Sequence, residues 1–243
     1  MRWVGFVGWL HLAFFGVLIP WSAIRAQKLI QSRPLPLRRK YFASVILQIT
    51  FFALISIFVA KKSWIVIFPR RMPSLIAIGI GVVFLAVAIA TGWPRWRKAI
   101  LERKKIVALF MPTNRNERFL WVLISALAGF GEEITWRGVQ TALLTRLTGS
   151  LIVAIVFAIV MFSIAHAMQG WQSVVVIAAF SAGFHLLVWL SGSLYVAMVV
   201  HFLYDLTAGF AYAHLARKHG YFIAAREEQT AATYPEHSET QTI

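Results

Sequence analysis

Seven long apolar segments, joined by shorter polar connections, dominate the pattern of the chain. Each is close to or above the roughly 20 residues that an α-helix needs to cross a bilayer. They cover residues 3–24, 41–60, 74–93, 119–147, 150–168, 171–190 and 193–215. A further apolar run, residues 64–68, is too short to span and lies between basic pairs, so we expect it at the membrane interface. The pattern predicts an all-α, polytopic transmembrane helix bundle with about seven spans, seven to eight in all.

The composition also favours a membrane protein. Of the 243 residues, 59% are hydrophobic and 14% are charged, whereas a soluble domain is about half apolar and about a quarter charged. The chain therefore has too little polar surface to coat a soluble globule of its size. Cysteine is absent, which excludes disulfides, thiolate nucleophiles and cysteine-ligated metal sites.

The basic residues gather in particular connections. The chain has 24 Lys and Arg against 9 Asp and Glu, and most of them follow the first, third and last apolar segments. Loops with such an excess face the cytoplasm. We therefore predict an outside N-terminus and a cytoplasmic tail in a bacterial-type cell membrane, with anionic membrane lipids as partners of the basic loops. The pattern contains no basic element of nucleic-acid-binding type, so no nucleic-acid partner is predicted.

Ionisable side chains inside the apolar segments are the informative ones. A charge near the bilayer centre costs about 2.5–3.5 kcal/mol even on a lenient scale, so such residues are rare and often functional. They are His11, Glu132, Glu133, Arg137, His166, His185, His201 and Asp205. Lone histidines such as His11 and His185 are more often simply hydrogen-bonded within a bundle.

The fourth segment contains two adjacent carboxylates and a guanidinium. In an α-helix, residues four apart share a face, so Glu133 can pair with Arg137, whereas Glu132 points about 140° away from Arg137. An unpaired carboxylate in such a site can serve as a general base. The alternative is a charge cluster that only holds helices together.

The seventh segment places His201 and Asp205 four residues apart on one face. A carboxylate beside an imidazole can fix its tautomer and raise its basicity. Asp205 is the only aspartate of the chain, which excludes a two-aspartate protease, and neither a His-Glu-x-x-His zinc motif nor a Gly-x-Ser-x-Gly elbow is present. A glutamate with two histidines remains, a set that can activate a water directly or hold a zinc ion that does so. Either chemistry hydrolyses an amide.

These residues resemble the motifs of the CPBP family of intramembrane proteases, which includes the CAAX prenyl endopeptidases and bacteriocin-processing or immunity-associated (Abi) relatives. Its first motif, Glu-Glu-x-x-x-Arg, matches Glu132, Glu133 and Arg137, and its second, Phe-x-x-x-His, matches Phe162 and His166. The third region resembles residues 180–183, followed by residues 191–194 and His201. The resemblance covers about residues 119–209.

Two positions depart from the family pattern. At the position of Asp205 the family commonly has Asn or Asp. An Asn there would offer an amide donor, whereas the carboxylate of Asp205 only accepts hydrogen bonds unless it is protonated. Leu187 stands where a second glycine is expected after Gly183, which could narrow the helix packing there. Neither change removes a motif residue.

The resemblance implies an intramembrane endopeptidase that cuts a protein or peptide near the cytoplasmic membrane face, with lipidated proteins among the family's substrates. It implies that Glu132 activates the water, that His166 assists it or binds a metal, and that His201 with Asp205 completes the site. Glu133 and Arg137 would position the first helix of the site. Family members are described both as metalloproteases and as glutamate-dependent proteases, so zinc bound by Glu132, His166 and His201 and a site without a cofactor both stay open.

The apolar pattern, the polar tail and the extent of the resemblance together divide the chain. Residues 1–118 are predicted to form N-terminal transmembrane helices with basic cytoplasmic loops, residues 119–215 a CPBP-like protease core, and residues 216–243 a disordered cytoplasmic tail. Two other functions stay open: a non-catalytic membrane scaffold or immunity protein of the same fold, and a transporter or ion pathway that uses the buried carboxylates and imidazoles as a proton relay. The sequence has no internal repeat of the kind common in transporters.

Overall fold

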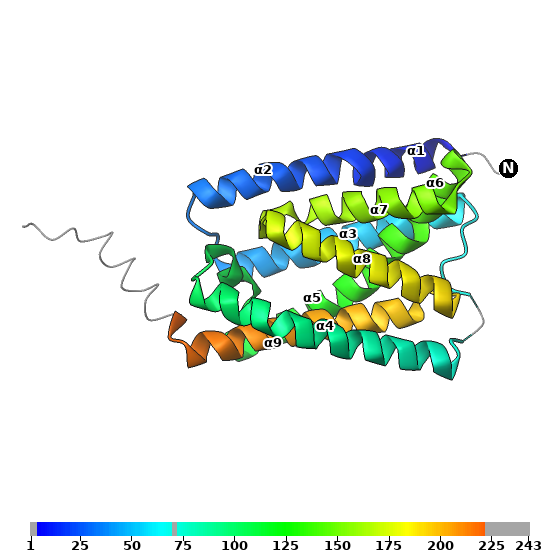
Figure 1. Ribbon diagram of the computed structural model, residues 1–243. Coiled ribbons are helices and arrows are strands. Elements are labelled where there is room, and N and C mark those ends of the chain that lie inside the picture. The colour runs from blue at the N-terminus through cyan, green and yellow to red at the C-terminus, as the bar shows by residue number, and fades with distance from the viewer. Residues whose placement is uncertain (1–3, 70–71, 222–243) are drawn as a thin grey trace, which may run out of the picture.

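The computed structural model describes residues 4–69 and 72–221, and it places them in helices and short connections, with no strand in these two ranges. Figure 1 shows the helices packed side by side, with successive spans running in opposite directions; α1, η1 and α2 form one span, and α5, η3 and α6 form another. The N-terminal half contains α1 (Phe6–Ala13), η1 (Phe14–Leu18), α2 (Ile19–Ser32), α3 (Arg38–Lys62) and α4 (Leu75–Leu101). The C-terminal half contains η2 (Lys105–Phe110), α5 (Arg115–Leu127), η3 (Ala128–Gln140), α6 (Thr141–Thr148), α7 (Leu151–Ala165), η4 (Ala167–Gln169), α8 (Trp171–Ser191) and α9 (Tyr195–Lys218).

The predicted spans are present as helices, and one of them is short. Six helices of the described chain are long and apolar enough to cross a membrane: Phe6–Ile30, Arg38–Lys62, Leu75–Leu101, Arg115–Thr148, Trp171–Ser191 and Tyr195–Lys218. The fifth predicted span is α7, which has only 15 residues and is therefore about 22 Å long, less than the roughly 30 Å of a hydrocarbon core. Residues 64–68 form no helix, so the described chain adds no eighth span. The predicted polytopic helical bundle is confirmed.

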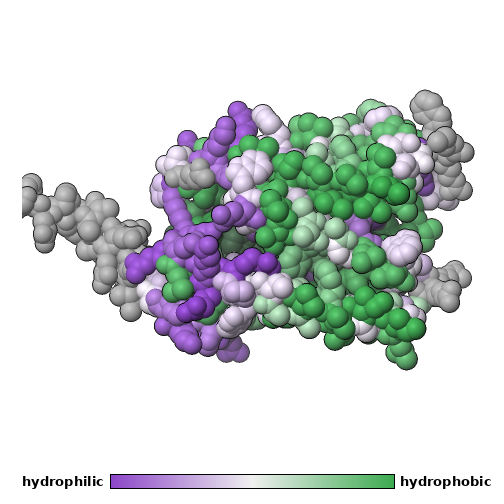
Figure 2. Space-filling model, in the orientation of Figure 1, coloured by the Kyte–Doolittle hydropathy of each residue, from purple (hydrophilic) through white to green (hydrophobic). Residues whose placement is uncertain are grey.

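Polar residues gather at one end of the bundle. The described chain begins at one end, and α9 finishes at the other (Figure 1). Figure 2 shows hydrophilic residues concentrated where α2, α4 and α9 end, whereas the rest of this face is largely hydrophobic. The alternating helices thus bring the basic connections of the sequence together at one end, and the assignment of that end to the cytoplasm stays a prediction.

The division of the chain into domains stays a prediction. Helix α5 begins at Arg115, before the expected start of the protease core at residue 119, and α9 ends at Lys218, three residues after the expected end at residue 215. Residues 222–243, which make up most of the predicted tail, lie outside the described residues.

The polar stretch between the third and fourth spans, residues 94–118, forms helical turns that pack against the bundle. Helix α4 continues through Pro94 and ends only at Leu101. Trp96 and Met111 are buried in a cluster with residues of α9, and η2 contributes Val107 to the same cluster. Burial of these apolar side chains explains why the stretch folds against the bundle despite its many charges.

The start of α5 is fixed by a network that also holds α3. The side chain of Asn114 accepts a hydrogen bond from the backbone N–H of Glu117 (3.0 Å), and the Glu117 carboxylate accepts one from the backbone N–H of Thr113 (2.8 Å). This is a capping arrangement that satisfies donors at a helix N-terminus. Arg38 of α3 forms an ion pair with Glu117 (3.1 Å), so the cap also ties the two helices together.

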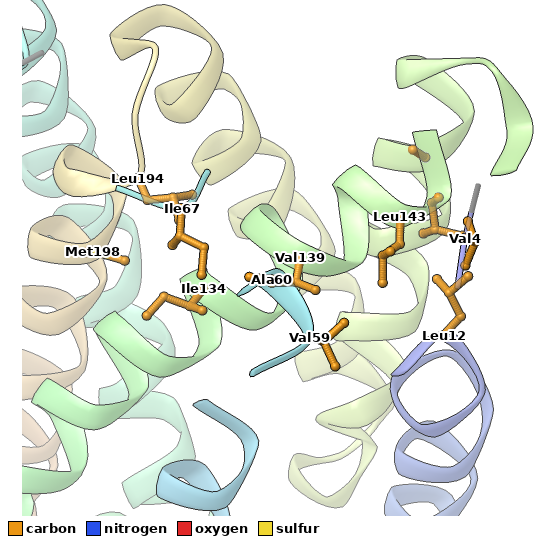
Figure 3. Close-up of a cluster of buried hydrophobic side chains, with 12 residues drawn as sticks. Val4, Leu12, Val59, Ala60, Ile67, Ile134, Val139, Leu143, Leu194 and Met198 are labelled. Atoms are coloured by element: carbon orange, nitrogen blue, oxygen red, sulfur yellow. The ribbon is translucent and has the colours of Figure 1, made fainter. Parts of the chain in front are cut away.

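A hydrophobic cluster packs η3 against α3 and α9 (Figure 3). Ile134 and Val139 of η3 are buried with Val59 of α3 and Met198 of α9. Because side chains from three elements interlock, the segment that carries the two adjacent glutamates has little freedom to rotate.

Candidate active site

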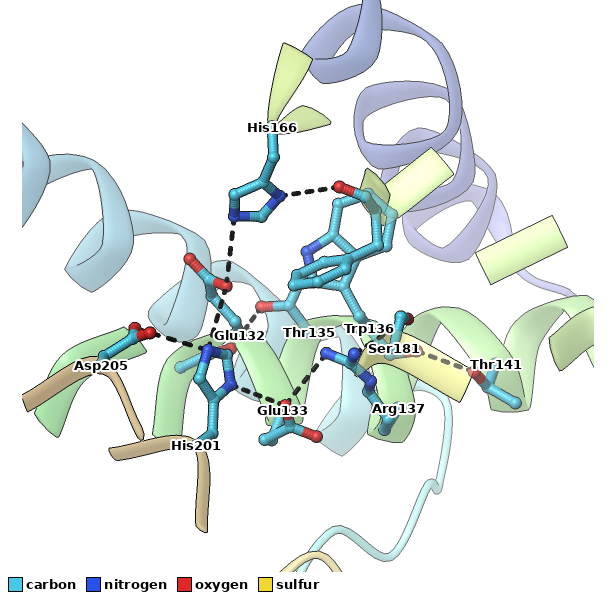
Figure 4. Close-up of polar contacts among 12 residues, drawn as sticks. Glu132, Glu133, Thr135, Trp136, Arg137, Thr141, His166, Ser181, His201 and Asp205 are labelled. Atoms are coloured by element: carbon cyan, nitrogen blue, oxygen red, sulfur yellow. Dashed lines mark hydrogen bonds and ion pairs between the residues drawn. The ribbon is translucent and has the colours of Figure 1, made fainter. Parts of the chain in front are cut away.

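Three separate elements bring the predicted site residues together, as Figure 4 shows. Segment η3 supplies two carboxylates and a guanidinium, the turn after α7 supplies one imidazole, and α9 supplies an imidazole and a carboxylate. The residues are Glu132, Glu133, Arg137, His166, His201 and Asp205, and each lies within 4.0 Å of at least one other member of the set. The structure therefore places all six predicted residues in one site.

The Glu133–Arg137 ion pair is the fully buried part of this site. Nη1 of Arg137 donates to Oε1 of Glu133 at 3.0 Å, and both side chains are fully buried. Nη2 donates to Oγ of Ser181 on α8 at 2.9 Å. The guanidinium carbon lies 4.3 Å from the ring centroid of Phe162 and 5.3 Å from that of Phe184. The pairing expected from the four-residue spacing is thus present, and two aromatic faces shield it from water.

The imidazole of His201 is oriented by Glu133. Its Nδ1 donates to Oε1 of Glu133 at 2.8 Å, so Nε2 faces the other two carboxylates, 4.0 Å from Glu132 and 3.5 Å from Asp205. The sequence had suggested Asp205, four residues away, as the group that fixes the tautomer. Glu133 fixes the tautomer instead, because the packing of α9 against η3 places Nδ1 of His201 beside the Glu133 carboxylate. Asp205 instead lies beside the nitrogen that faces Glu132.

His166 follows the last residue of α7. Its Nδ1 donates to the backbone carbonyl of Phe162 at 2.8 Å, and its Nε2 lies 3.9 Å from Oε2 of Glu132. From the sequence, His166 should lie near the membrane face, whereas Glu132 and His201 come out nearer the middle. The short α7 resolves this difference in depth, because a helix that ends at Ala165 stops before it crosses the full hydrocarbon core.

The wide helical turn of η3 brings both glutamates to the same histidine. Here the backbone is π-helical, and the N–H of Thr141 at its end donates to the carbonyl of Trp136, five residues earlier. In a regular α-helix, consecutive side chains diverge by about 100°. In η3, Glu132 and Glu133 both approach His201. The sequence treated this segment as an ordinary α-helix and missed the wide turn, a feature often found at functional sites.

A glycine allows η3 to approach α9 closely. A Cβ atom on Gly129 would lie 2.7 Å from the carbonyl oxygen of Met198 and 2.7 Å from the backbone nitrogen of Phe202. Both contacts involve backbone, which cannot move aside as a side chain can. Only a residue without a side chain fits at this position, one turn before Glu132 and beside the turn that carries His201.

One side of the site is more accessible than the other. The side chains of Glu132, His166 and Asp205 are 18%, 24% and 32% exposed, whereas those of Glu133 and Arg137 are fully buried. Water or a substrate can therefore reach the Glu132 side, while the Glu133–Arg137 pair supports it from behind.

The geometry gives no support to a zinc ion at this site. Two ligands bound 2.0–2.1 Å from a tetrahedral zinc lie about 3.4 Å apart, but Nε2 of His166 and of His201 lie 3.9 Å and 4.0 Å from the Glu132 carboxylate. Within residues 4–69 and 72–221, no three His, Cys, Asp or Glu residues are arranged to hold a metal ion. Zinc binding by Glu132, His166 and His201 stays a prediction.

Sequence reasoning assigned no part to several side chains that shape the site. Ser181 binds Arg137, and the ring of Phe184 stacks on that of His201, with centroids 4.9 Å apart and planes at 24°. A serine inside an apolar span is a signal of interhelical hydrogen bonding, whereas nothing marks Phe184 among its hydrophobic neighbours. His11 bonds to Gln140 and Ser56, as expected of a histidine held within the bundle.

A comparison with known families identifies the segment that carries this site. Residues 114–207 match the family model described as type II CAAX prenyl endopeptidase Rce1-like. No curated protein and no solved structure matches the chain. The matched range contains all six site residues and agrees with the resemblance drawn from the sequence. Over residues 114–207, this integral membrane protein therefore matches the Rce1-like CAAX prenyl endopeptidases, which supports its resemblance to the CPBP protease family.

Proposed function

We propose that the protein is an intramembrane endopeptidase in which Glu132 activates a water molecule to hydrolyse a peptide bond. One observation carries the proposal: the Glu132 carboxylate lies near the Nε2 atoms of two histidines from separate elements, 3.9 Å from His166 and 4.0 Å from His201. A water placed among these three groups can be held and deprotonated in the same position, as general base catalysis needs.

The hydrogen bonds of the two imidazoles fix which nitrogen faces the water. The Nδ1 atoms of His166 and His201 bond to a carbonyl oxygen and to a carboxylate oxygen, both of which only accept. Each Nδ1 therefore carries a proton, and each Nε2 is the atom left to interact with the water or the substrate. Both rings thus present the same nitrogen to Glu132.

The proton moves from the water to the leaving amine by way of Glu132. In the first step the carboxylate takes a proton from the water as its oxygen bonds to the carbonyl carbon of the substrate. In the second step the C–N bond breaks, and the amine nitrogen receives that proton. The products are one carboxylic acid and one amine, so the reaction consumes one water. The Nε2 atoms of His166 and His201 orient the water and the reacting carbonyl, which lowers the entropic part of the barrier.

The remaining residues hold this arrangement in place. Glu133 fixes the His201 ring, and Arg137 neutralises Glu133 while bonding to Ser181 on α8. Asp205, at 3.5 Å from Nε2 of His201, limits how that ring can tilt. Of the six residues, Glu132, His166 and His201 are thus proposed to meet the reacting atoms, and the other three to position them.

The substrate is proposed to be a protein or peptide whose cleaved bond enters from the exposed side of Glu132. The site lies inside a bundle whose face in Figure 2 is largely hydrophobic away from its hydrophilic end. A substrate with a lipid anchor suits such a site, because the anchor stays in the bilayer while the peptide reaches the carboxylate.

Cleavage of a peptide library by the protein purified in detergent, with products identified by mass spectrometry, tests the proposal. We expect cleaved peptides with the wild type and none with Glu132→Ala. Glu102→Gln is the matched control, because Glu102 is half-exposed and pairs with Lys98 and Lys104 at the end of α4. The proposal fails if the wild type cleaves no peptide that Glu132→Ala leaves intact.

Other outcomes would point to the two other functions. A non-catalytic scaffold predicts that Glu132→Gln, which is nearly isosteric, preserves the biological phenotype. A transporter predicts a measurable flux in liposomes, lost in Glu132→Gln, with no peptide cleaved by the wild type.

A further inference from the structure

Three buried polar atoms behind the site lack a hydrogen-bond partner among the described residues. They are Oε2 of Glu133, Nε of Arg137 and Nε2 of His185. The first two side chains are fully buried, and His185 as a whole is only 6% exposed. Leaving one buried polar atom without a partner costs roughly 1–3 kcal/mol, so three such atoms in one region call for an explanation.

The three atoms come from neighbouring parts of the fold. His185 lies one helical turn after Ser181 on α8, and Ser181 accepts a hydrogen bond from Arg137. His185 also interacts electrostatically with both Arg137 and Glu133. The imidazole, the guanidinium and the carboxylate therefore share one buried polar region of the bundle.

The chemistry of the three atoms matches one water molecule. Nε of Arg137 can only donate, a carboxylate oxygen can only accept, and an imidazole nitrogen can do either according to its tautomer. A water that accepts from Arg137 and donates to Glu133 still has a donor and an acceptor for His185. Buried waters in proteins make about three hydrogen bonds to polar groups that otherwise lack partners.

We propose that one ordered water joins Glu133, Arg137 and His185, and that His185 is thereby a positioning residue for His201. The water fixes one oxygen of the Glu133 carboxylate, and the other oxygen holds Nδ1 of His201 at 2.8 Å. A carboxylate held at both oxygens cannot rotate, so the imidazole stays aimed at Glu132. The effect on catalysis rests on the proposed function, whereas the water site itself does not.

A structure of the purified wild-type protein, at a resolution that shows ordered waters, tests the site without any assay of activity. We expect density for one water within hydrogen-bonding distance of all three atoms. In His185→Leu this density should weaken or vanish. Absence of the water from the wild type overturns the proposal, even if the protein proves to be a protease.

Two substitutions of His185 test its effect on catalysis. His185→Leu removes the polar atom, whereas His185→Gln places an amide group close to the position of Nε2. With a peptide that the wild type cleaves, we expect His185→Leu to lower kcat by roughly 10- to 100-fold, the usual effect of removing a residue that orients a reacting group. KM should stay unchanged, because the His185 side chain is buried, and His185→Gln should recover most of the lost kcat.

Ser125→Ala is the matched control. Oγ of Ser125 is also buried without a partner among the described residues, but Ser125 lies on α5 and takes no part in the contacts of Glu133, Arg137 or His185 given above. This variant should keep the wild-type kcat. A kcat of His185→Leu equal to that of the wild type, or a change in KM alone, contradicts the positioning part. A wild type without protease activity contradicts the proposed function instead and leaves the water site to be decided by the structure.

Discussion

One oxygen of Glu133 joins the buried ion pair to the imidazole of His201: Oε1 accepts from Nδ1 of His201 at 2.8 Å and from Nη1 of Arg137 at 3.0 Å. A change at Glu133 therefore affects the stability of the bundle and the orientation of the site together. Hydrogen bonds that involve charged groups are the stronger ones in proteins, and burial strengthens them further.

Loss of the Glu133 charge should destabilise the protein and abolish catalysis. Glu133→Gln leaves the Arg137 guanidinium as an uncompensated buried charge, a situation that typically costs about 3–5 kcal/mol. We expect a clear drop in Tm in a thermal unfolding experiment in detergent, compared with no drop for Glu102→Gln.

A double substitution separates the two effects. Replacing the pair together, as Glu133→Leu with Arg137→Met, removes both charges, and buried pairs can often be replaced in this way at little cost in stability. Tm should then recover while peptide cleavage stays absent, because nothing holds Nδ1 of His201. Recovery of cleavage in the double variant would show that Glu133 is not needed to orient the histidine.

The close approach of η3 to α9 should tolerate no side chain at Gly129. Gly129→Ala places a methyl group 2.7 Å from backbone atoms of α9, and overpacking of this kind costs about 1–3 kcal/mol. Separation of the two elements should also move Glu132 away from His201, so we expect lower kcat together with lower Tm.

Gly79→Ala is the matched control for Gly129→Ala. A Cβ at Gly79 of α4 meets no atom within 4 Å, so this variant should leave Tm and kcat at wild-type values. If both alanine variants behave alike, the distance between η3 and α9 does not limit the site.

The shape of the side chain at position 205 should matter more than its charge. Asp205 touches Nε2 of His201 at 3.5 Å and is partly exposed, so an amide of the same size can occupy its place. We expect Asp205→Asn to keep kcat/KM within about tenfold of the wild type and Asp205→Ala to lose more than that, on the scale of residues that orient a reacting group. Equal losses in the two variants would show that the carboxylate itself takes part in the reaction.

Removal of metal should leave the activity in place. The distances between Glu132 and the two histidines, 3.9 Å and 4.0 Å, exceed the spacing of about 3.4 Å for ligands of a tetrahedral zinc. After dialysis against a chelator, the purified protein should cleave its peptide at the rate found before dialysis, and metal analysis should find less than one zinc per chain. Loss of cleavage that added zinc restores would assign the site to metal chemistry.

The helices and the composition of the site could be predicted from the sequence. Apolar stretches long enough to span a bilayer mark the helices directly, and charges inside them are costly enough to stand out. The four-residue spacing of Glu133 and Arg137 predicted their ion pair. These features depend on local sequence, where a single chain carries most of the information.

The relations between helices could not be predicted in the same way. The wide turn of η3 depends on its packing against α3 and α9, and the contact of Glu133 with His201 depends on how η3 and α9 are aligned. The early end of α7 lies within an apolar stretch that hydropathy alone extends to Met168. Phe184 looks like any other lipid-compatible residue until the fold places its ring on His201.

The most direct test of the account is the turnover of a cleaved peptide by Glu132→Gln, measured beside Glu102→Gln at equal amounts of folded protein. Glutamine keeps the size of the side chain but cannot take a proton from water. Since general base catalysis contributes roughly 10²- to 10⁴-fold, kcat of Glu132→Gln should fall by at least about 100-fold, and Glu102→Gln should match the wild type. A kcat of Glu132→Gln within a few-fold of the wild-type value would contradict the assignment of Glu132 as the base.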